Sequence, residues 1–469
     1  MPFNYIISQI IGMAQKPEKF MTKNFSTWLI GLFLLAALLR FSTLGRNSFW
    51  FDEAWTVFRA AQPVAVTLRG DIDLGRPPLY YVGLHYWINW FGDGEISARL
   101  PSALASLFSV GLVYLLGLQI SNRRVALVGM SLLALSPLHV WYGQEVRMYI
   151  FIAFLGLVAA NGLAWGSWLA ILPVTAALTA GLYVDFPMIP LWVGLSAAFL
   201  VYWQVRGRPA RPFLVWLSAT ILSAVLYYPW WGKTAALFNL LNNIHVFSAT
   251  RRALRLPEFS AGQYMAALLA AGAALTLLLG VAYKLLQRDK VRRLLTPPAI
   301  VLFLLLTMAF VWPRFYGIKR VLATGWPYVC LFVAWLVVAW EEKRRPVWYG
   351  LLGVSLAATL AMLLFVPKDD WRGATAYVAG RAEAGDVVWI DPAWNVAAWN
   401  YYRPDMPAYS GGPEKLAQLA VTDVWLVAER FPGQEIPASP GEAWLDENLP
   451  LVEAVPFYRL EVRHYRPDK

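Results

Sequence analysis

Two adjacent carboxylates provide the first candidate for chemistry in this sequence. Asp52 and Glu53 occur in FWFDEAWT, with aromatic residues on both sides. A carboxylate held against apolar surface loses hydration, which raises its pKa and makes it a stronger base. The structural alternative is a solvated helix cap at Asp52 with a helix starting at Glu53, because Asp is a favoured N-cap residue. The pair therefore predicts a candidate general base, with a capping role as the alternative.

A second acidic segment, QEVRMY at 144–149, combines opposite charges with an aromatic residue. Glu145 and Arg147 cannot both face lipid, so at least one of them points into the protein or a cavity. A salt bridge that fixes a helix end is an equally good explanation. We treat Glu145 as a candidate catalytic residue, and Arg147 and Tyr149 as candidate substrate-binding residues.

The third segment is basic and has the sequence WPRFYGIKR. Arg314, Lys319 and Arg320 fall on the outer side of the topology derived below, where basic clusters are disfavoured. An anionic ligand would explain them, because Arg forms paired hydrogen bonds to phosphate oxygens. Anionic lipid headgroups are the alternative. Arg76, beside two prolines, is a candidate fourth contributor.

The composition indicates which solvent surrounds these segments. The chain has 469 residues, of which 58% are hydrophobic and 15% charged, and its mean hydropathy is +0.48. Soluble domains carry about 25% charged residues, so the bilayer must solvate most of this chain. The net charge of +11 does not indicate nucleic acid, because the basic residues lie in short clusters between apolar runs. The single Cys330 excludes a disulfide framework or a cysteine-based metal site.

Runs of about 20 apolar residues predict eleven membrane spans. The basic segment before the first run is expected in the cytoplasm, with that run kept as an anchor. Alternation then places the basic clusters near residues 123, 208, 290 and 344 inside, as the positive-inside rule requires. The predicted spans are 25–44, 100–120, 125–141, 148–165, 167–184, 186–204, 213–231, 263–287, 296–312, 321–340 and 347–366.

One apolar segment, residues 78–92, is too short to span and would invert the charge pattern if it did. We expect a helix lying at the outer interface within an outer loop at 45–99. Its aromatic side chains suit an interfacial belt, namely Tyr80, Tyr81, Tyr86, Trp87 and Trp90.

The composition changes after the last predicted span, where charged residues become frequent. Residues 385–391 and 421–430 read as buried strands, and 371–385 has helical spacing. We therefore predict a transmembrane domain at 1–366 and a small extracytoplasmic α/β domain at 367–469.

Taken in order, these segments resemble the bacterial GT-C glycosyltransferases related to protein O-mannosyltransferases and lipid A aminoarabinose transferases. The likeness rests on Asp52-Glu53, GRPPLYY (75–81), RLPSALASLFSVGLVYLLG (99–117), SPLHVWYGQEVRMY (136–149), PRFYGIKRVLATGWPYVCL (313–331) and DDWRGATAYV (369–378). It implies a multi-pass plasma-membrane enzyme with an outward-facing site, a polyprenyl-phosphate-sugar donor and inversion at the anomeric carbon. The acceptor would be a protein, a lipid or a glycan.

The resemblance also implies roles for individual residues. The acid of the first outer loop matches Asp52, with Glu53 beside it, and would activate the acceptor. The acid of the second loop matches Glu145. Arg314 and Arg320 match the residues that hold the donor phosphate. A divalent ion bridging Asp52 and Glu145 is compatible with this set.

Two other classes of protein fit a multi-pass chain. A secondary transporter buries charges near the bilayer midplane, often in two repeated halves, whereas the predicted spans here are almost free of charge. A scaffold or flippase for envelope glycan assembly is the other alternative. The sequence contains no Walker loop, no glycine-rich dinucleotide motif and no histidine pair at helical spacing. It therefore gives no motif-based indication of ATP, dinucleotide or zinc binding.

Overall fold

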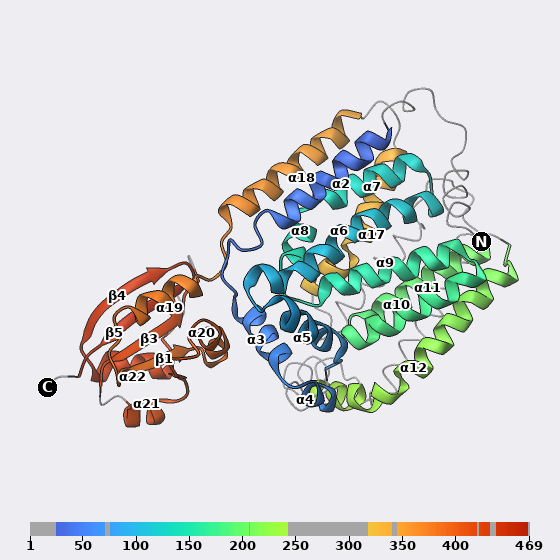
Figure 1. The fold of residues 1–469 in the computed structure, drawn as a ribbon. Coiled ribbons are helices and arrows are strands. Elements are labelled where there is room, and N and C mark those ends of the chain that lie inside the picture. The colour runs from blue at the N-terminus through green and yellow to red at the C-terminus, as the bar shows by residue number, and fades with distance from the viewer. Residues whose placement is uncertain are drawn as a thin grey trace, which may run out of the picture.

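The computed structural model describes residues 25–70, 76–205, 207–242, 318–339, 345–419, 422–431 and 438–467. Long helices form the larger part of the molecule, and a small sheet with its own helices forms the C-terminal part (Figure 1). The expectation of a mostly helical chain with a small C-terminal sheet is therefore confirmed.

Each predicted span inside the described residues coincides with one long helix or with two consecutive helices, because the apolar runs are continuous. The spans 263–287 and 296–312 lie outside the described residues, so the count of eleven stays a prediction. The helices are α2 (Phe25–Phe41), α6 (Glu95–Ile120), α7 (Arg123–Ala134), α8 (Pro137–Gly143), α9 (Tyr149–Trp165), α10 (Ile171–Val184), α11 (Met188–Val205), α12 (Ala210–Asn242), α17 (Ile318–Ala339) and α18 (Arg345–Phe365).

Length and composition alone qualify three helices of the described part as membrane spans, in α6, α12 and α18. The pair α7 and α8, bent by 58°, would make a fourth. The remaining apolar helices are shorter, and several of them pack against one another in the centre of the bundle. Helices of these lengths can cross a bilayer when two consecutive short helices form one bent span.

The predicted turn between two uncharged spans is confirmed at Gly166. This residue ends α9 in the left-handed conformation with φ of 60°, which glycine adopts without strain. The 3-10 turn Trp168–Ala170 then leads into α10.

The close packing of α6 against α7 depends on another glycine. A Cβ on Gly117 would lie 2.6 Å from the Cα of Ala126.

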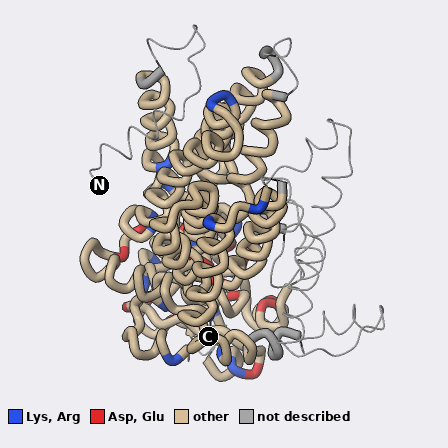
Figure 2. The backbone as a smooth tube through the Cα atoms, turned by 90° about the vertical axis from the view of Figure 1, so that its right-hand side faces the viewer, with Lys and Arg blue, Asp and Glu red and all other residues tan. Residues whose placement is uncertain are grey.

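The acidic residues of the helical part gather at one end of the bundle. In Figure 2 the Asp and Glu residues lie mainly in the lower half of the view. In the described part of residues 25–366 they are Asp52, Glu53, Asp93, Glu95, Glu145 and Asp185. The described long helices thus carry few charges in their interiors, with the buried Arg40 of α2 and Lys233 of α12 as exceptions.

Three short helices connect α2 to α6: α3 (Phe51–Ala61), α4 (Val64–Arg69) and α5 (Leu79–Phe91). The helix expected near 78–92 is present as α5, but its aromatic residues divide into two groups. Tyr86 and Trp90 are 48% and 75% exposed, whereas Tyr80 and Tyr81 are buried. Two of the five expected belt residues therefore pack in the core instead.

The C-terminal part contains a five-stranded sheet with the order β2-β1-β3-β5-β4. Strands β1 (Val387–Asp391) and β3 (Val424–Glu429) are parallel and buried, which confirms both predicted strands. The helix expected after residue 370 is present as α19 (Trp371–Ala379). The sequence did not reveal η3 (Ala393–Asn395), α20 (Val396–Tyr402), β2 (Ala408–Tyr409), α21 (Pro413–Leu419), α22 (Pro440–Asn448), β4 (Leu451–Phe457) or β5 (Leu460–Tyr465).

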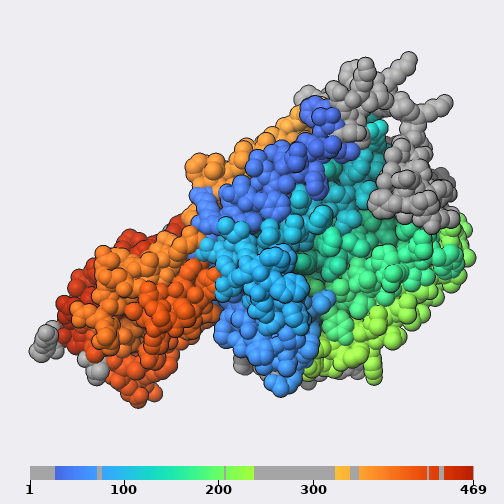
Figure 3. Space-filling model, viewed as in Figure 1, coloured from blue at the N-terminus to red at the C-terminus, as the bar shows by residue number. Residues whose placement is uncertain are grey.

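The C-terminal part packs against the acidic end of the helical part (Figure 3). Helix α20 contacts α3, and the backbone N–H of Phe49 donates to the Tyr402 hydroxyl at 2.7 Å. Tyr402 also hydrogen-bonds Glu95, the first residue of α6. The sheet therefore lies beside the segment that contains Asp52 and Glu53.

Candidate active site at the acidic end of the helices

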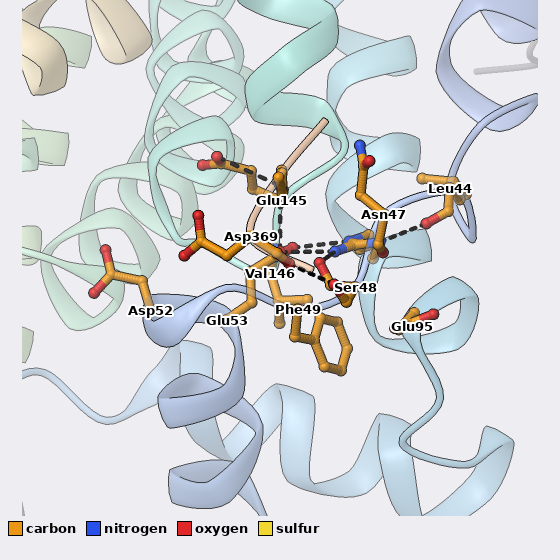
Figure 4. Close-up of polar contacts among 12 residues, drawn as sticks. Leu44, Asn47, Ser48, Phe49, Asp52, Glu53, Glu95, Glu145, Val146 and Asp369 are labelled. Carbon is orange, nitrogen blue, oxygen red and sulfur yellow. Dashed lines mark hydrogen bonds and ion pairs between the residues drawn. The ribbon is translucent and has the colours of Figure 1, made fainter. Parts of the chain in front are cut away.

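Glu53 and Arg99 form a fully buried ion pair between α3 and the first turns of α6. The Glu53 carboxylate accepts hydrogen bonds from Arg99 at 2.8 and 2.7 Å and from the Val146 backbone N–H at 3.0 Å. The other N–H groups of Arg99 donate to the carbonyl oxygens of Leu44, Asn47 and Ser48, so every guanidinium donor has an acceptor. Figure 4 shows the contacts of Glu53 together with the loop residues Leu44, Asn47 and Ser48.

The surroundings of Glu53 hold its carboxylate in the charged form. Burial alone would raise the pKa of Glu53, but the nearby Arg99 and Lys368 outweigh it and lower the pKa to about 2. A carboxylate with this pKa, no exposed surface and occupied oxygens is a weak base. The contacts of Glu53 are those of a structural anchor.

Glu145 lies on the other side of a shared cation. The Lys368 ammonium is 3.2 Å from a Glu53 oxygen and 3.6 Å from a Glu145 oxygen. Burial raises the pKa of Glu145 above its usual range, and the charge of Glu53 adds to this effect, whereas Lys368 and Arg147 oppose it. Two buried carboxylates are therefore bridged by one ammonium.

Asp52 is the carboxylate of this group that remains accessible. Its side chain is 30% exposed, compared with 0% for Glu53 and 5% for Glu145. Figure 4 shows its carboxylate lying to one side of the Glu53 contacts. The capping alternative is wrong, because α3 begins at Phe51 with Trp50 at its N-cap. Asp52 sits in the first turn, where the helix dipole favours a negative charge.

Arg147 faces Asp52 from the segment before α9. Its guanidinium is 3.5 Å from the Asp52 carboxylate and also donates to the Tyr149 hydroxyl at 3.3 Å. The Arg147 side chain is almost completely buried, and its Nε–H has no acceptor within the described part of the chain. An accessible carboxylate thus lies beside a buried, incompletely satisfied cation.

The site also contains residues that the sequence analysis did not select, namely Arg99 and Lys368. Arg99 could have been found, because an arginine at the start of an apolar helix needs a buried partner. Lys368 carries a weaker signal, as the first charged residue after α18. No sequence spacing indicates that it returns to a carboxylate 315 positions earlier.

The structure describes only part of the predicted basic cluster. Arg314 lies outside the described residues. Lys319 and Arg320 fall in the first turn of α17, and the structure describes that helix without their side chains. Arg76 is partly buried just before α5. The structure thus brings Asp52, Arg147 and Tyr149 together, and the basic cluster stays a prediction.

A divalent ion between Asp52 and Glu145 does not fit the arrangement described. Each of these carboxylates faces a cation, Arg147 or Lys368. Among the described residues, no group of three or more His, Cys, Asp or Glu is placed to hold a metal ion. The carboxylates here are paired with basic side chains and not presented to a metal.

Comparison with known families and proteins gives matches over parts of the chain. The family described as dolichyl-phosphate-mannose-protein mannosyltransferase matches residues 75–232. An uncharacterized protein of Aquifex aeolicus (strain VF5) is 25% identical over 41% of this chain. That alignment also covers 41% of the relative, so the chain spans less than half the length of this protein.

Solved structures resemble the chain over most of its length. ArnT from Cupriavidus metallidurans in the apo state has a TM-score of 0.56 at 13% identity, covering 94% of this chain and 98% of that one. The Archaeoglobus fulgidus oligosaccharyltransferase tethered to an acceptor peptide has a TM-score of 0.54 at 11% identity, covering 88% and 70%. The same enzyme, AglB, with an inhibitory peptide and a dolichol-phosphate has a TM-score of 0.51 at 11% identity, covering 87% and 70%.

The fold and the apolar helices are similar to those of membrane glycosyltransferases, and part of the chain matches a glycosyltransferase family. The family match over residues 75–232 and the shared fold agree with the resemblance to GT-C glycosyltransferases noted from the sequence. At these identities the solved structures establish the fold alone.

Proposed function

We propose that this chain transfers a sugar from a polyprenyl-phosphate donor to an acceptor hydroxyl on the extracytoplasmic face of the plasma membrane, with inversion at the anomeric carbon. Asp52 is the general base in this proposal. The donor phosphate is held by the basic cluster Arg314, Lys319 and Arg320, with Arg76 and Arg147 as further contacts. The acceptor is a protein, a lipid or a glycan.

The observation that carries the proposal is the pairing of Asp52 with Arg147. Asp52 is the accessible member of three clustered carboxylates, with 30% of its side chain exposed. Glu53 is anchored by Arg99 and Glu145 is tied to Lys368. Asp52 is therefore the carboxylate best able to reach an acceptor hydroxyl, and the Arg147 guanidinium lies 3.5 Å from it.

The reaction follows from these positions. Asp52 takes the proton of the acceptor hydroxyl as its oxygen forms a bond to the anomeric carbon. The bond between that carbon and the phosphate oxygen breaks, and the electron pair leaves with the polyprenyl phosphate. Arginine side chains stabilise the growing negative charge without proton transfer. Attack opposite to the leaving group inverts the anomeric centre.

A lipid-phosphate donor is supported by a structural neighbour. AglB has been solved in complex with a dolichol-phosphate, and its fold covers 87% of this chain. The outer orientation is supported by the charge pattern of the sequence. Glu95 begins α6 and Arg123 follows the other end of this helix, so an acidic residue of the outer region and a predicted cytoplasmic cluster lie at opposite ends of α6.

The proposal can be tested in cells and with the purified protein. Cells with the wild-type protein, with Asp52→Asn or without the protein should be compared by mass spectrometry of their envelope glycans and lipids. We expect the last two to accumulate the same polyprenyl-phosphate sugar and to lose one glycan modification. Asp93→Asn is the matched control, because Asp93 is an exposed aspartate of the same outer region. Identical profiles in all strains would contradict the proposal.

An assay on the purified protein distinguishes a glycosyltransferase from the two alternatives, a secondary transporter and a scaffold or flippase. A glycosyltransferase in nanodiscs converts a polyprenyl-phosphate sugar into free polyprenyl phosphate when the acceptor fraction is added. A transporter or flippase moves its cargo between compartments and leaves the phosphate–sugar bond intact. Transport across vesicles without donor cleavage would replace the proposal by one of these functions.

A further inference from the structure

Lys368 extends from the C-terminal segment into the helical part of the molecule. It lies between the end of α18 at Phe365 and the start of α19 at Trp371. Its side chain is 7% exposed, and its ammonium also lies 5.1 Å from the centre of the Trp141 ring. A lysine in a linker between two parts of a protein is normally solvated, so burial at this position calls for a partner.

The two carboxylates that contact Lys368, Glu53 and Glu145, differ in how many other groups bind them. Glu53 already accepts two hydrogen bonds from Arg99 and one from Val146. Glu145, by contrast, forms one ion pair among the described residues, with Lys368 at 3.6 Å. The ammonium therefore adds to the hold of Arg99 on Glu53, whereas for Glu145 it is the basic partner itself.

The backbone around Lys368 is fixed on both sides. The Ser48 hydroxyl donates to the carbonyl oxygen of Asp369 at 2.5 Å. On the side of the sheet, Arg459 lies 3.1 Å from the Asp369 carboxylate and the Asp370 N–H donates to the Tyr458 carbonyl at 3.0 Å. The segment at 366–370 thus joins the loop before α3 to the hairpin of β4 and β5.

We propose that Lys368 is a positioning residue for the glycosyl transfer inferred above, and that it acts through Glu145. It holds the Glu145 carboxylate against the anchored pair of Glu53 and Arg99, at the edge of the site that contains Asp52. The C-terminal segment thereby completes a charge cluster whose other described members, Asp52, Glu53, Arg99, Glu145 and Arg147, come from the first third of the chain. This proposal rests on the proposed function, because it assigns the role within that reaction.

The physical reason is the cost of leaving two buried carboxylates beside each other. Removing the ammonium leaves Glu145 desolvated and next to the negative charge of Glu53. Its carboxylate then moves toward solvent or takes up a proton, and either change displaces the edge of the site. Small displacements of a positioned group lower the rate of the chemical step more than they change substrate affinity.

The test is a double-mutant cycle on Lys368 and Glu145 in the full-length protein. We expect Lys368→Met to lower kcat by about 10- to 100-fold, with KM for the polyprenyl-phosphate sugar changed by less than about threefold, as fits a residue outside donor binding. Lys368→Arg should recover part of the loss, because it keeps the charge. Lys368→Met combined with Glu145→Gln should be no slower than Glu145→Gln alone, because the two residues act as one unit.

Other outcomes would overturn the proposal. Additive losses in the cycle, a wild-type rate in Glu145→Gln, or no recovery in Lys368→Arg would each remove the link between Lys368 and Glu145. Lys415→Met is the matched control, as an exposed lysine of the C-terminal part whose ammonium contacts the Ser410 carbonyl. It should retain the wild-type kcat, and a comparable loss there would point to general damage.

A second measurement separates this proposal from the proposed function. Thermal unfolding of the same four proteins reports the coupling of Lys368 to Glu145 without any activity. If wild-type protein transfers no sugar but the unfolding midpoints are non-additive, the proposed function fails and the tie between the residues stands. Additive midpoints together with additive rates would reject the tie while leaving the transferase function in place.

Discussion

Arg99 holds Glu53 through two hydrogen bonds, at 2.8 and 2.7 Å, across the junction between α3 and α6. The same guanidinium satisfies three carbonyl oxygens of the loop that leads from α2 to α3. One ion pair therefore sets the path of the backbone that presents Asp52. The neighbouring acids at 52 and 53 thus have different surroundings and are expected to have different functions.

Breaking the pair between Glu53 and Arg99 should destabilise the protein. Glu53→Gln leaves Arg99 buried with its charge uncompensated, which costs about 3–5 kcal/mol in comparable buried pairs. We expect a clear drop in the thermal unfolding midpoint in detergent. The matched control is Arg403→Met, because Arg403 and Asp405 form an exposed pair worth about 0–1 kcal/mol. Equal shifts in the two variants would argue against an anchoring role for Glu53.

The stability of the protein should depend on pH through Glu53. The pKa of Glu53 is lowered in the folded state to about 2 from an ordinary value of 4.5, so the folded state binds this proton less tightly than the unfolded state. The resulting stabilisation is present above pH 4.5 and is lost as the pH falls toward 2. The loss amounts to about 3 kcal/mol. Unfolding of wild type and Glu53→Gln between pH 7 and about pH 3 should show a smaller fall in the variant, and parallel curves would contradict this prediction.

Asp52→Asn should nearly abolish transfer while leaving donor binding intact. General base catalysis contributes roughly 10²–10⁴-fold, and the amide keeps the size of the side chain. The measurements are turnover with the native acceptor and equilibrium binding of the polyprenyl-phosphate sugar. A variant that keeps more than about a tenth of the wild-type rate would fall outside that range, and the role of base would then move to Glu145.

Arg314→Ala should weaken binding of a polyprenyl-phosphate sugar and of free polyprenyl phosphate by a similar factor. Losing one charge-assisted hydrogen bond costs about 1.5–3 kcal/mol, or roughly 10- to 100-fold in affinity. Arg314→Lys should recover only part, because an ammonium cannot pair with two oxygens in the same plane. Unchanged affinity for the free lipid phosphate would remove Arg314 from the donor site.

The orientation of the chain can be tested across a single helix. Asp93→Cys and Arg124→Cys place exposed thiols on either side of α6. The native Cys330 is buried, so it contributes little background. A membrane-impermeant maleimide should label position 93 on intact cells and position 124 only after permeabilisation. Labelling of both on intact cells would contradict the predicted crossing by α6.

The long helices could be predicted from the sequence because a bilayer requires continuous apolar length. The same reasoning found α5 as a helix but not the burial of Tyr80 and Tyr81, which depends on the neighbouring helices. Arg59 lies 3.7 Å over the Tyr81 ring, and Phe151 of α9 packs on Tyr80. Burial of an aromatic side chain is decided by tertiary packing, which local hydropathy does not describe.

The hairpin of β4 and β5 escaped prediction for a local reason. Its turn contains Tyr458 and Arg459, and Arg459 adopts a left-handed conformation with φ of 61°. Sequence signals for tight turns rely on glycine or asparagine at such positions. The exposed alternation along β4 also differs from the continuous burial of β1 and β3. Buried strands were visible in the sequence, and the half-exposed strand was not.

The candidate site was only partly readable from the sequence. Asp52, Glu145 and Arg147 were found because charges stand out beside apolar runs, and the structure brings them into one region. The distinct environments of Asp52 and Glu53 could not be read, because they depend on Arg99 and Lys368, which lie 46 and 315 positions from Glu53. Adjacent residues of the same chemistry are distinguished only by their partners.

The position of Lys368 also determines when the site can be completed during synthesis. A chain that ends at Phe365 contains Asp52, Glu53, Glu145 and the long helices of the described part, but lacks the ammonium that pairs with Glu145. Glu53 meets Arg99 as soon as α6 has been made, whereas Glu145 waits until the last helix has entered the bilayer. The linker thus makes completion of the site one of the final events of biogenesis, after the ribosome has passed the membrane-embedded sequence.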